Sequence, residues 1–317
     1  MVKKIIFLFI FFFISCTKSV YKDKFVISGT YLEVISPYKE AAETVYKEFK
    51  RLDKIFNLYD PDSEINKLNS TYNKPFKCSK ELMEVILLAK EVYNLTDGAF
   101  DISFGTPYEF WKNLIKKGKI NRFPSQEEIG RIKELGGMQY LEIDKEKGTI
   151  TIKKEGLKID LGAIAKGYMV DKAVLKLKEK GINSALINAG GDIYCLGKNK
   201  DKFWKVGIRD PKRRGIIETQ TLFDEAIATS GNYEQFFEFK GKRYSHLIDP
   251  RTGFAVDNNV LSVSVITKNC TSADALSTAF FVLGLEGIKK ILSQHPSTMR
   301  IFVITEEKDR ENIYIFK

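Results

Sequence analysis

The chain has 317 residues, of which 44% are hydrophobic and 12% aromatic, so it can bury one large core or two smaller ones. Its formal net charge of +10 comes from lysines interspersed with glutamates, and the most compact basic runs, 116–119 and 212–214, contain no aromatic residues. Because nucleic-acid binding proteins concentrate their basic residues in a stripe, this pattern excludes nucleic acid as an expected partner.

Residues 1–15 are predicted to be a signal peptide. Two lysines precede the apolar run 5–14, which is shorter than the ~20 residues needed to span a bilayer. Cys16 follows at once and predicts a lipid anchor, with ordinary secretion and an incidental cysteine as the alternative. Residues 16–24 would tether the domain, residues 25–317, to a lipid bilayer. We therefore expect an exported protein, anchored at Cys16 to a bacterial membrane and facing the periplasm.

The other cysteines are Cys78, Cys195 and Cys270. None belongs to a CxxC pair, and three cysteines cannot all pair within one chain. We therefore expect neither a zinc site nor a disulfide framework, and at most one disulfide bond.

The first half of the domain is predicted to be mainly helical. Alternating residues over 25–34 predict a strand that is broken at Gly29. The spacing of apolar residues predicts helices over 39–57, 64–68 and 80–95. Polar helix formers then fill 102–140, which we expect to be a small helical insertion, and short strands follow within 140–159.

The second half is predicted to be richer in strands. Helices are expected over 163–180, 274–283 and 286–293. Strands are expected over 185–187, 204–208, 220–228, 235–239, 260–266, 299–305 and 313–316. Because groups of adjacent strands alternate with helices, the sequence predicts an α+β fold with a mainly antiparallel sheet flanked by helices.

Residues 160–168 (DLGAIAKGY) are typical of a strand end that turns through glycine into a helix. Backbone N–H groups at a helix N-terminus carry partial positive charge and bind phosphate. Lys166 adds a full positive charge, and Asp160 adds a carboxylate at the strand end. The segment therefore predicts a phosphate site, although a glycine-capped helix with a solvated lysine has the same pattern.

A second group of polar residues lies on the predicted helix that begins near residue 274. Asp274 and Thr278 are four residues apart and so project from one helical face, with Ser277 adjacent. These oxygen donors suit Mg²⁺, which often shares its coordination with a substrate phosphate. The alternative is that Thr271, Ser272 and Asp274 cap the helix N-terminus.

His246 is one of only two histidines, and it precedes an Asp-Pro-x-Thr-Gly turn. An imidazole titrates near neutral pH, so His246 is a candidate general base, with a purely structural role as the alternative. Two glycines in residues 188–192 (NAGGD) allow close approach of the backbone to a ligand or to another strand, and equally form a simple turn. Tyr59 could stack on a planar ring or fill space.

Seven segments together resemble the ApbE family of FAD:protein FMN transferases. They are 59–64 (YDPDSE), 96–101 (TDGAFD), 160–168 (DLGAIAKGY), 188–192 (NAGGD), 230–233 (SGNY), 246–253 (HLIDPRTG) and 273–279 (ADALSTA). They occur in the family's order and span most of the domain. One position departs from the pattern: Ser28 stands where many members carry a methionine.

The resemblance implies a T-fold-like enzyme that transfers FMN from FAD to a Thr or Ser hydroxyl of a target protein and releases AMP. The implied targets are flavin-bearing subunits of membrane redox complexes. The implied metal ligands for Mg²⁺ are the Ala163 carbonyl oxygen, Asp274 and Thr278, with Ser277 as a further candidate. The implied FAD contacts are Tyr59, Ala99, Phe100, Asp101, Asp160, Lys166 and Ile248. His246 takes the place of the family's proposed base, and Lys166 would stabilise the developing charge.

Two other functions are compatible with the sequence. The first is hydrolysis of FAD to FMN and AMP with water as the nucleophile, as in some members of the family that the sequence resembles. A flavin-binding lipoprotein without catalysis belongs to a different class, and the complete set of Asp274, Thr278 and His246 argues against it.

Overall fold

The computed structural model describes residues 20–317 apart from 118–121, 214, 233–235, 241 and 308–309. The predicted signal peptide, Cys16 and residues 17–19 of the tether therefore lie outside the described residues, whereas residues 21–24 of the predicted tether belong to the first strand. In the part of the chain that is described, none of the helices combines the length and the apolar character needed to cross a bilayer. The three cysteines of the domain are free thiols.

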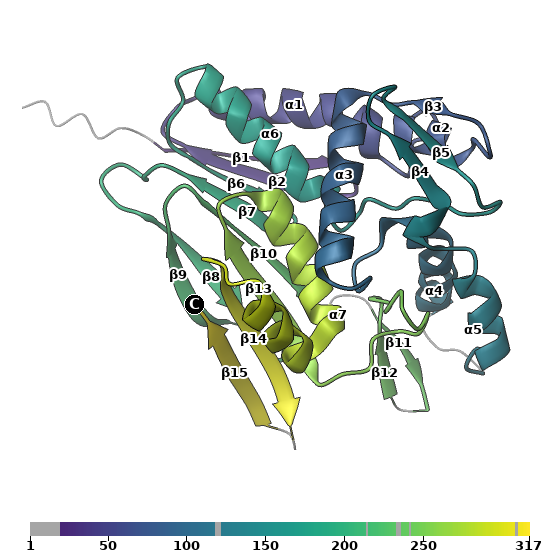
Figure 1. Ribbon diagram of the computed structural model, residues 1–317. Coiled ribbons are helices and arrows are strands. Elements are labelled where there is room, and N and C mark those ends of the chain that lie inside the picture. Colours follow the sequence, from purple (N-terminus) through teal and green to yellow (C-terminus); the bar gives the residue numbers. More distant parts are fainter. Residues whose placement is uncertain (1–19, 118–121, 214, 233–235, 241, 308–309) are drawn as a thin grey trace, which may run out of the picture.

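An eight-stranded antiparallel sheet forms the centre of the molecule (Figure 1). Its strands lie in the order β1-β2-β6-β7-β10-β13-β14-β15. Their bounds are β1 Tyr21–Ile27, β2 Thr30–Ser36, β6 Ala185–Ala189, β7 Asp192–Leu196, β10 Glu225–Gly231, β13 Val260–Thr267, β14 Arg300–Glu307 and β15 Arg310–Phe316. The α+β class with a mainly antiparallel sheet, predicted from the sequence, is confirmed.

Three helices lie against one face of this sheet (Figure 1). They are α1 Ala41–Phe56, α6 Ala165–Glu179 and α7 Cys270–Gln294. In α1, Val45, Phe49 and Leu52 recur at helical spacing and are buried in the main core together with residues of α6. The contacts of α6 with both α1 and α7 hold the N-terminal ends of α6 and α7 close together.

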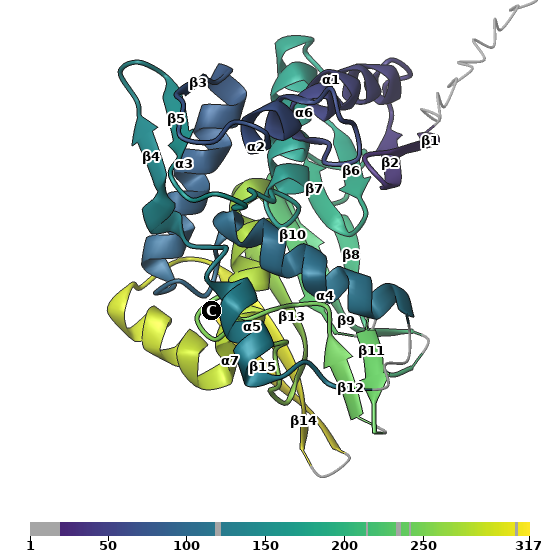
Figure 2. The same cartoon turned by 90° about the vertical axis from the view of Figure 1, so that its right-hand side faces the viewer.

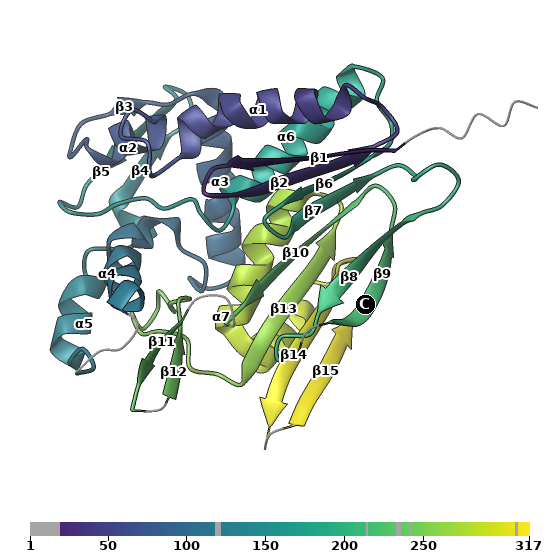
Figure 3. The ribbon, with the colours of Figure 1, turned by 180° about the vertical axis from the view of Figure 1, so that it is seen from behind.

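The opposite face of the sheet is covered by a hairpin of β8 (Trp204–Arg209) and β9 (Ile216–Leu222), which Figure 3 shows from behind. Buried residues of β8 alternate with exposed ones, as expected for a strand with one solvated face. Trp204 is buried in the hydrophobic cluster between this hairpin and the sheet. Its Nε1–H donates to the carbonyl oxygen of Leu196 at 3.1 Å.

The segment predicted as an insertion contains α4 (Gly105–Lys117) and α5 (Gln126–Lys133), which lie beside a hairpin of β11 (Phe236–Phe239) and β12 (Lys242–Ser245) (Figure 2). Trp111 of α4 is 1% exposed, and its Nε1–H donates to the Gly253 carbonyl oxygen at 3.0 Å. This contact joins α4 to the loop that carries His246. The remaining elements on this side are α2 Glu64–Asn69, β3 Phe76–Lys77, α3 Lys80–Leu95, η1 Ile102–Phe104, η2 Met138–Tyr140, β4 Leu141–Asp144 and β5 Thr149–Ile152.

Each of two predicted strands is in fact a pair of strands, and the first is divided at Gly29, where the sequence predicted a break. Residues 25–34 form the hairpin β1–β2, which turns at Ser28 and Gly29 with φ values of 53° and 72°. Positive φ at both turn residues matches the twist of the flanking strands. Residues 220–228 are likewise divided between β9 and β10 by a turn at Asp224, where φ is 48°. The strand β7 was missed, because residues 193–196 were assigned to no element.

The predicted pair of helices over 274–283 and 286–293 corresponds to α7, which is interrupted at Gly284. Gly284 has φ 68° and ψ −179°, a conformation that side chains disfavour and glycine tolerates. The first part of α7 therefore runs in its own direction. This part carries Asp274, Ser277 and Thr278.

Candidate functional site

A cavity of about 520 Å³ lies where the N-terminal ends of α6 and α7 meet α4 and the loop that follows β12. Eleven of the site residues predicted from the sequence line it: Tyr59, Ala99, Phe100, Asp101, Asp160, Ala163, Lys166, His246, Ile248, Asp274 and Thr278. These residues are scattered from position 59 to position 278, yet the fold brings them to one place. Ser277 is the only predicted site residue that is not part of the lining.

We call the part of the cavity formed by the N-terminal ends of α6 and α7 its floor. Lys166 lies on this floor between the buried carboxylates of Asp192 and Asp274. Its Nζ lies 3.1 Å from Asp192 Oδ2 and 3.6 Å from Asp274 Oδ2, and it donates to the Gly162 carbonyl oxygen at 2.9 Å. The side chains of Asp192 and Asp274 are 7% and 6% exposed. The alternative of a solvated lysine is therefore wrong, because one ammonium group serves two buried acids.

The pKa values of this cluster reflect its burial. Burial, with the charge of Asp274, raises the pKa of Asp192 to about 7 in spite of the opposing effect of Lys166. Burial also raises the pKa of Asp274, although Lys166 and the Gly167 N–H oppose this. Burial alone would lower the pKa of Lys166, but the charges of Asp192 and Asp274 outweigh it and raise that pKa. Because the carboxylates of Asp192 and Asp274 share the single ammonium group of Lys166, the cluster can accommodate a further positive charge.

Gly167 explains why the helix N-termini can approach so closely. A Cβ at this position would lie 2.4 Å from the Cys270 carbonyl oxygen, which is closer than atoms can come. The Gly167 N–H donates to Asp274 Oδ2 at 3.1 Å and so links α6 directly to the carboxylate on α7. Lys166 thus supplies a positive charge, and the neighbouring Gly167 supplies the space that lets α7 approach α6.

The free N–H groups expected at the start of α6 are partly occupied within the protein. The Gly162 N–H donates to Asp160 Oδ1 at 2.8 Å, and the Ile164 and Ala165 N–H groups donate to the Leu161 carbonyl oxygen. The turn therefore offers fewer open N–H groups to a phosphate than its sequence pattern suggests. Positive charge at this end of the cavity comes mainly from lysine side chains.

Asp274 does not cap α7, so the capping alternative was wrong for this residue. Asn269 is the N-cap, and its side chain accepts the Ser272 N–H at 2.8 Å. The Asp171 carboxylate accepts the N–H groups of Cys270 and Thr271 at 2.7 and 2.8 Å. Because these two residues satisfy the helix terminus, the Asp274 carboxylate is left to face Lys166 and the cavity.

Hydroxyl groups continue the polar floor beyond Asp274. Ser230 Oγ at the end of β10 lies 3.0 Å from Thr278 Oγ1 and 2.9 Å from Ser277 Oγ. Ser277 Oγ donates to the Asp274 carbonyl oxygen at 2.9 Å. Thr278 and Ser230 line the cavity, whereas Ser277 is 1% exposed and lies behind them.

The opposite wall comes from α4 and was missed by the sequence analysis. Tyr108, Lys112 and Lys116 recur every four residues and all line the cavity. The Lys112 Nζ lies 3.6 Å from Asp160 Oδ2 and 4.5 Å from the centre of the Tyr108 ring. Lys116, which the sequence identified only as part of the basic run 116–119, therefore also belongs to this wall. Its spacing from Tyr108 and Lys112 was the signal that could have identified it.

The rest of the cavity lining includes other residues that the sequence predicted for the site. His246 follows β12, and Ile248 pairs with Ala255 in a bridge that closes the His246 loop. Asp101 lines the cavity and accepts the Ser103 N–H at 2.8 Å, so it also begins η1. Tyr59 lines the cavity and is 79% exposed as a whole residue.

The β1–β2 turn and the NAGGD turn have structural roles that the sequence left open. The Ser28 hydroxyl donates to Asp53 Oδ1 at 2.6 Å. A Cβ at Gly190 would lie 2.3 Å from Thr30 Oγ1, so this glycine allows close approach of the neighbouring strand. Gly190 also lines the cavity, which places the strand contact and the site at the same turn.

The oxygen-rich floor fits a divalent cation of the hard class. Among the described residues, no group of three or more His, Cys, Asp or Glu side chains is arranged to hold a metal ion. The donors at hand are instead one carboxylate on Asp274, the Thr278 hydroxyl and the carbonyl oxygen of Ala163, a set that suits Mg²⁺ with bound water. Asp192 Oδ2 is buried and receives no well-directed hydrogen bond, although Lys166 Nζ is 3.1 Å away. Because one ammonium group is shared between this carboxylate and that of Asp274, the cluster carries excess negative charge, which favours a cation nearby.

The chain is similar to several FAD:protein FMN transferases and to solved ApbE structures. It is 33% identical to the FAD:protein FMN transferase of Vibrio cholerae over 278 residues, which cover 85% of this chain and 82% of that protein. It is 30% identical to the FAD:protein FMN transferase of Treponema pallidum, over 85% of this chain and 78% of that protein.

Solved structures agree with these relatives. The crystal structure of the ApbE protein from Thermotoga maritima matches with a TM-score of 0.83 and 31% identity, covering 93% of this chain and 96% of that one. The flavin transferase ApbE from Vibrio cholerae matches with a TM-score of 0.82 and 28% identity, covering 94% and 97%. The model of the ApbE family matches residues 21–303. By sequence and by fold, the chain belongs to the ApbE family.

Proposed function

We propose that this protein transfers FMN from FAD to a Thr or Ser hydroxyl of a protein substrate and releases AMP. The observation that carries the proposal is the meeting of Asp274, Thr278, Lys166 and His246 at one cavity of about 520 Å³. The similarity to FAD:protein FMN transferases from two bacteria supports it. The cavity volume is in the range of ligand pockets.

In the proposed reaction, the substrate hydroxyl oxygen attacks the phosphorus atom of the FMN half of FAD. A new phosphorus–oxygen bond forms, and the bond between that phosphorus and the bridging oxygen breaks. AMP leaves with the bonding electrons. His246, which lines the cavity, accepts the proton of the hydroxyl group. Lys166 offsets the negative charge that develops on the diphosphate.

Mg²⁺ is the proposed metal. Ala163, through its carbonyl oxygen, Asp274 and Thr278 would hold it, with Ser277 behind them as a further candidate. When bound, the cation supplies charge neutralisation at the diphosphate. FAD is proposed to contact Tyr59, Ala99, Phe100, Asp101, Asp160, Lys166 and Ile248, all of which line the cavity.

The protein substrates are proposed to be flavin-bearing subunits of membrane redox complexes. A lipid anchor at Cys16 would keep the enzyme on the same membrane surface as such subunits. The short polar segment between Cys16 and β1, which begins at Tyr21, is consistent with this arrangement. We therefore propose an exported enzyme whose catalytic domain faces the periplasm.

The test is incubation of the domain with FAD, Mg²⁺ and a candidate acceptor protein, followed by mass spectrometry of the acceptor. We expect a Thr or Ser of the acceptor to gain the mass of one FMN molecule less one water molecule. A reaction without acceptor that yields FMN and AMP at the same rate would support an FAD pyrophosphatase instead. Tight FAD binding with neither product would indicate a non-catalytic flavin-binding protein.

A further inference from the structure

Asp192 is the buried acid of the cavity to which the proposed reaction assigns no role. It begins β7, directly after the Gly190–Gly191 turn, and the whole residue is 5% exposed. Its Oδ2 has no well-directed hydrogen bond, and its nearest cationic partner is Lys166 Nζ at 3.1 Å. A carboxylate this deeply buried is costly unless it is paired, so its contact with Lys166 is its main compensation.

Lys166 is placed unequally between its two acidic neighbours. Its Nζ is 3.1 Å from Asp192 but 3.6 Å from Asp274, and its hydrogen bond to the Gly162 carbonyl oxygen directs it further toward the α6 turn. Without Asp192, the nearest carboxylate for this ammonium group would be Asp274. Lys166 would then compete with any divalent cation for the same carboxylate.

We propose that Asp192 is a positioning residue that holds the Lys166 ammonium group away from Asp274 and so keeps the Asp274 carboxylate available to a divalent cation. This inference rests on the proposed function, since it assumes a cation at Asp274. Asp192 itself acts through Lys166 and does not need to touch substrate or metal. The Gly162 carbonyl oxygen, one residue before Ala163, is held by the same lysine.

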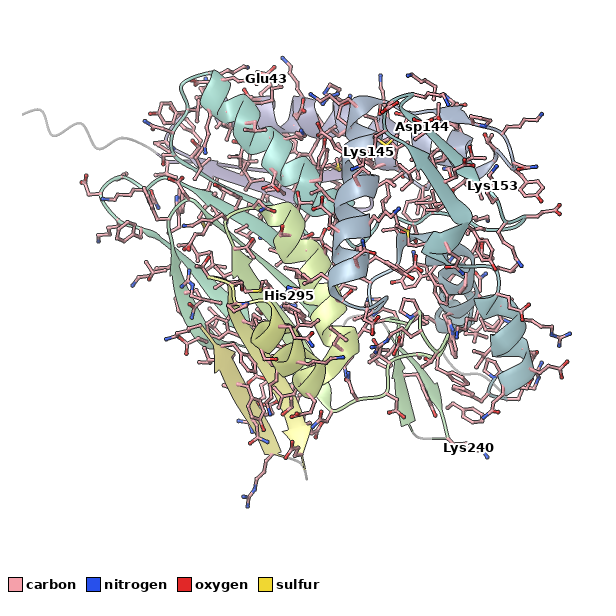
Figure 4. All side chains as sticks on the ribbon, in the orientation of Figure 1. Glu43, Asp144, Lys145, Lys153, Lys240 and His295 are labelled. Carbon is pink, nitrogen blue, oxygen red and sulfur yellow. The ribbon has the colours of Figure 1, made fainter. Side chains whose placement is uncertain are left out.

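The first experiment measures the binding of Mn²⁺ to the metal-free domain by electron paramagnetic resonance of the free ion. Asp192→Asn keeps the shape of the side chain, and we expect it to weaken the Mn²⁺ affinity roughly 10- to 100-fold, as is usual for residues that orient metal ligands. Asp144→Asn is the matched control, because Asp144 lies at the outer surface (Figure 4), pairs with Lys147 and does not line the cavity. We expect no change in that variant.

The outcomes of this experiment separate the two proposals. If the wild-type domain binds Mn²⁺ and Asp192→Asn binds it equally well, the role of Asp192 is refuted while the proposed function stands. If the wild-type domain binds no Mn²⁺, or Asp274→Ala binds it as tightly as the wild type, the metal in the proposed function is refuted and this inference falls with it.

A double-mutant cycle distinguishes positioning from simple loss of negative charge. Lys166→Met removes the competitor, so Asp192→Asn should change the Mn²⁺ affinity less than twofold in that background. An equal loss in both backgrounds would show that Asp192 acts only through its charge and would overturn the proposal. Lys166→Gln serves the same purpose if the methionine variant does not fold.

A crystal structure of metal-free Asp192→Asn provides a test that needs no lysine variant. We expect Lys166 Nζ to move into direct hydrogen-bonding distance of Asp274, from the 3.6 Å of the unaltered protein. A lysine that remains where it is, or turns out into solvent, would contradict the proposed positioning role.

Discussion

The two sides of the cavity are built in different ways. The floor, formed by the N-terminal ends of α6 and α7, is held by backbone contacts and buried charges such as the Gly167 N–H bond to Asp274. The wall, formed by α4, presents the half-buried side chains of Tyr108 and Lys112 and the exposed side chain of Lys116. The Lys112 side chain is 35% exposed, whereas that of Asp274 is 6% exposed.

This difference indicates how each side can contribute to function. On the floor, the carboxylates of Asp192 and Asp274 are almost fully buried, so each interacts strongly with its neighbours and an error in position is costly. On the wall, charges are screened by water and contribute less per residue. We therefore expect the floor to carry the chemistry and the wall to adjust substrate affinity.

The largest effect is expected from Asp274→Ala. Removing the carboxylate takes away the proposed metal ligand and several kcal/mol of charge stabilisation, so FMN transfer should fall by at least about 1,000-fold. The rate is measured by mass spectrometry of the acceptor, with Asp144→Asn as the control. A variant that transfers FMN at the wild-type rate would rule out a metal-binding role for this floor residue.

The next effect is expected from His246→Ala, in the loop that follows β12. Loss of a general base should slow the transfer about 100-fold, while FAD binding, followed by fluorescence titration, is retained. The reverse result, loss of FAD binding in a correctly folded variant, would reassign His246 to substrate binding. Circular dichroism of the variant checks the fold.

The sequence predicted the floor better than the wall for a physical reason. Asp160, Lys166, Asp274 and Thr278 stand in segments whose glycines and helix starts restrict the backbone, so their neighbourhood could be inferred from local pattern and from the family resemblance. Tyr108, Lys112 and Lys116 lie within an ordinary amphipathic helix. Their spacing shows that they share a face, but only tertiary packing decides what that face meets.

The fold shows the same contrast between local and long-range information. The helix over 80–95 was predicted with the bounds of α3, because Ser79 caps it and its apolar residues follow helical spacing. Strand β7 was missed, because only its pairing with β6 and β10 distinguishes it from a loop. The turn at Asp224 was also missed, since β9 and β10 follow each other closely in sequence but belong to different sheets.

The packing of the floor is tested by Gly167→Ala. The added Cβ would meet the Cys270 carbonyl oxygen at 2.4 Å, so α6 and α7 must separate, and we expect a loss of about 1–3 kcal/mol in the free energy of unfolding. Urea denaturation measures it. The control is Gly130→Ala in α5, where no atom lies within 4 Å of the new Cβ and where alanine should stabilise the helix by up to about 1 kcal/mol. Equal stability of the two variants would mean that the helices are not in tight contact.

The smallest effect is expected on the wall, from Lys112→Ala. Its ion pair with Asp160 spans 3.6 Å and is partly exposed, and such pairs contribute about 0–1 kcal/mol. The KM for FAD should therefore rise no more than about fivefold, with kcat nearly unchanged. Lys153→Ala, which removes an exposed pair with Glu142 outside the cavity, should change neither constant. If Lys112→Ala instead slowed turnover as strongly as we expect for His246→Ala, this lysine would belong with the chemistry and the distinction between floor and wall would disappear.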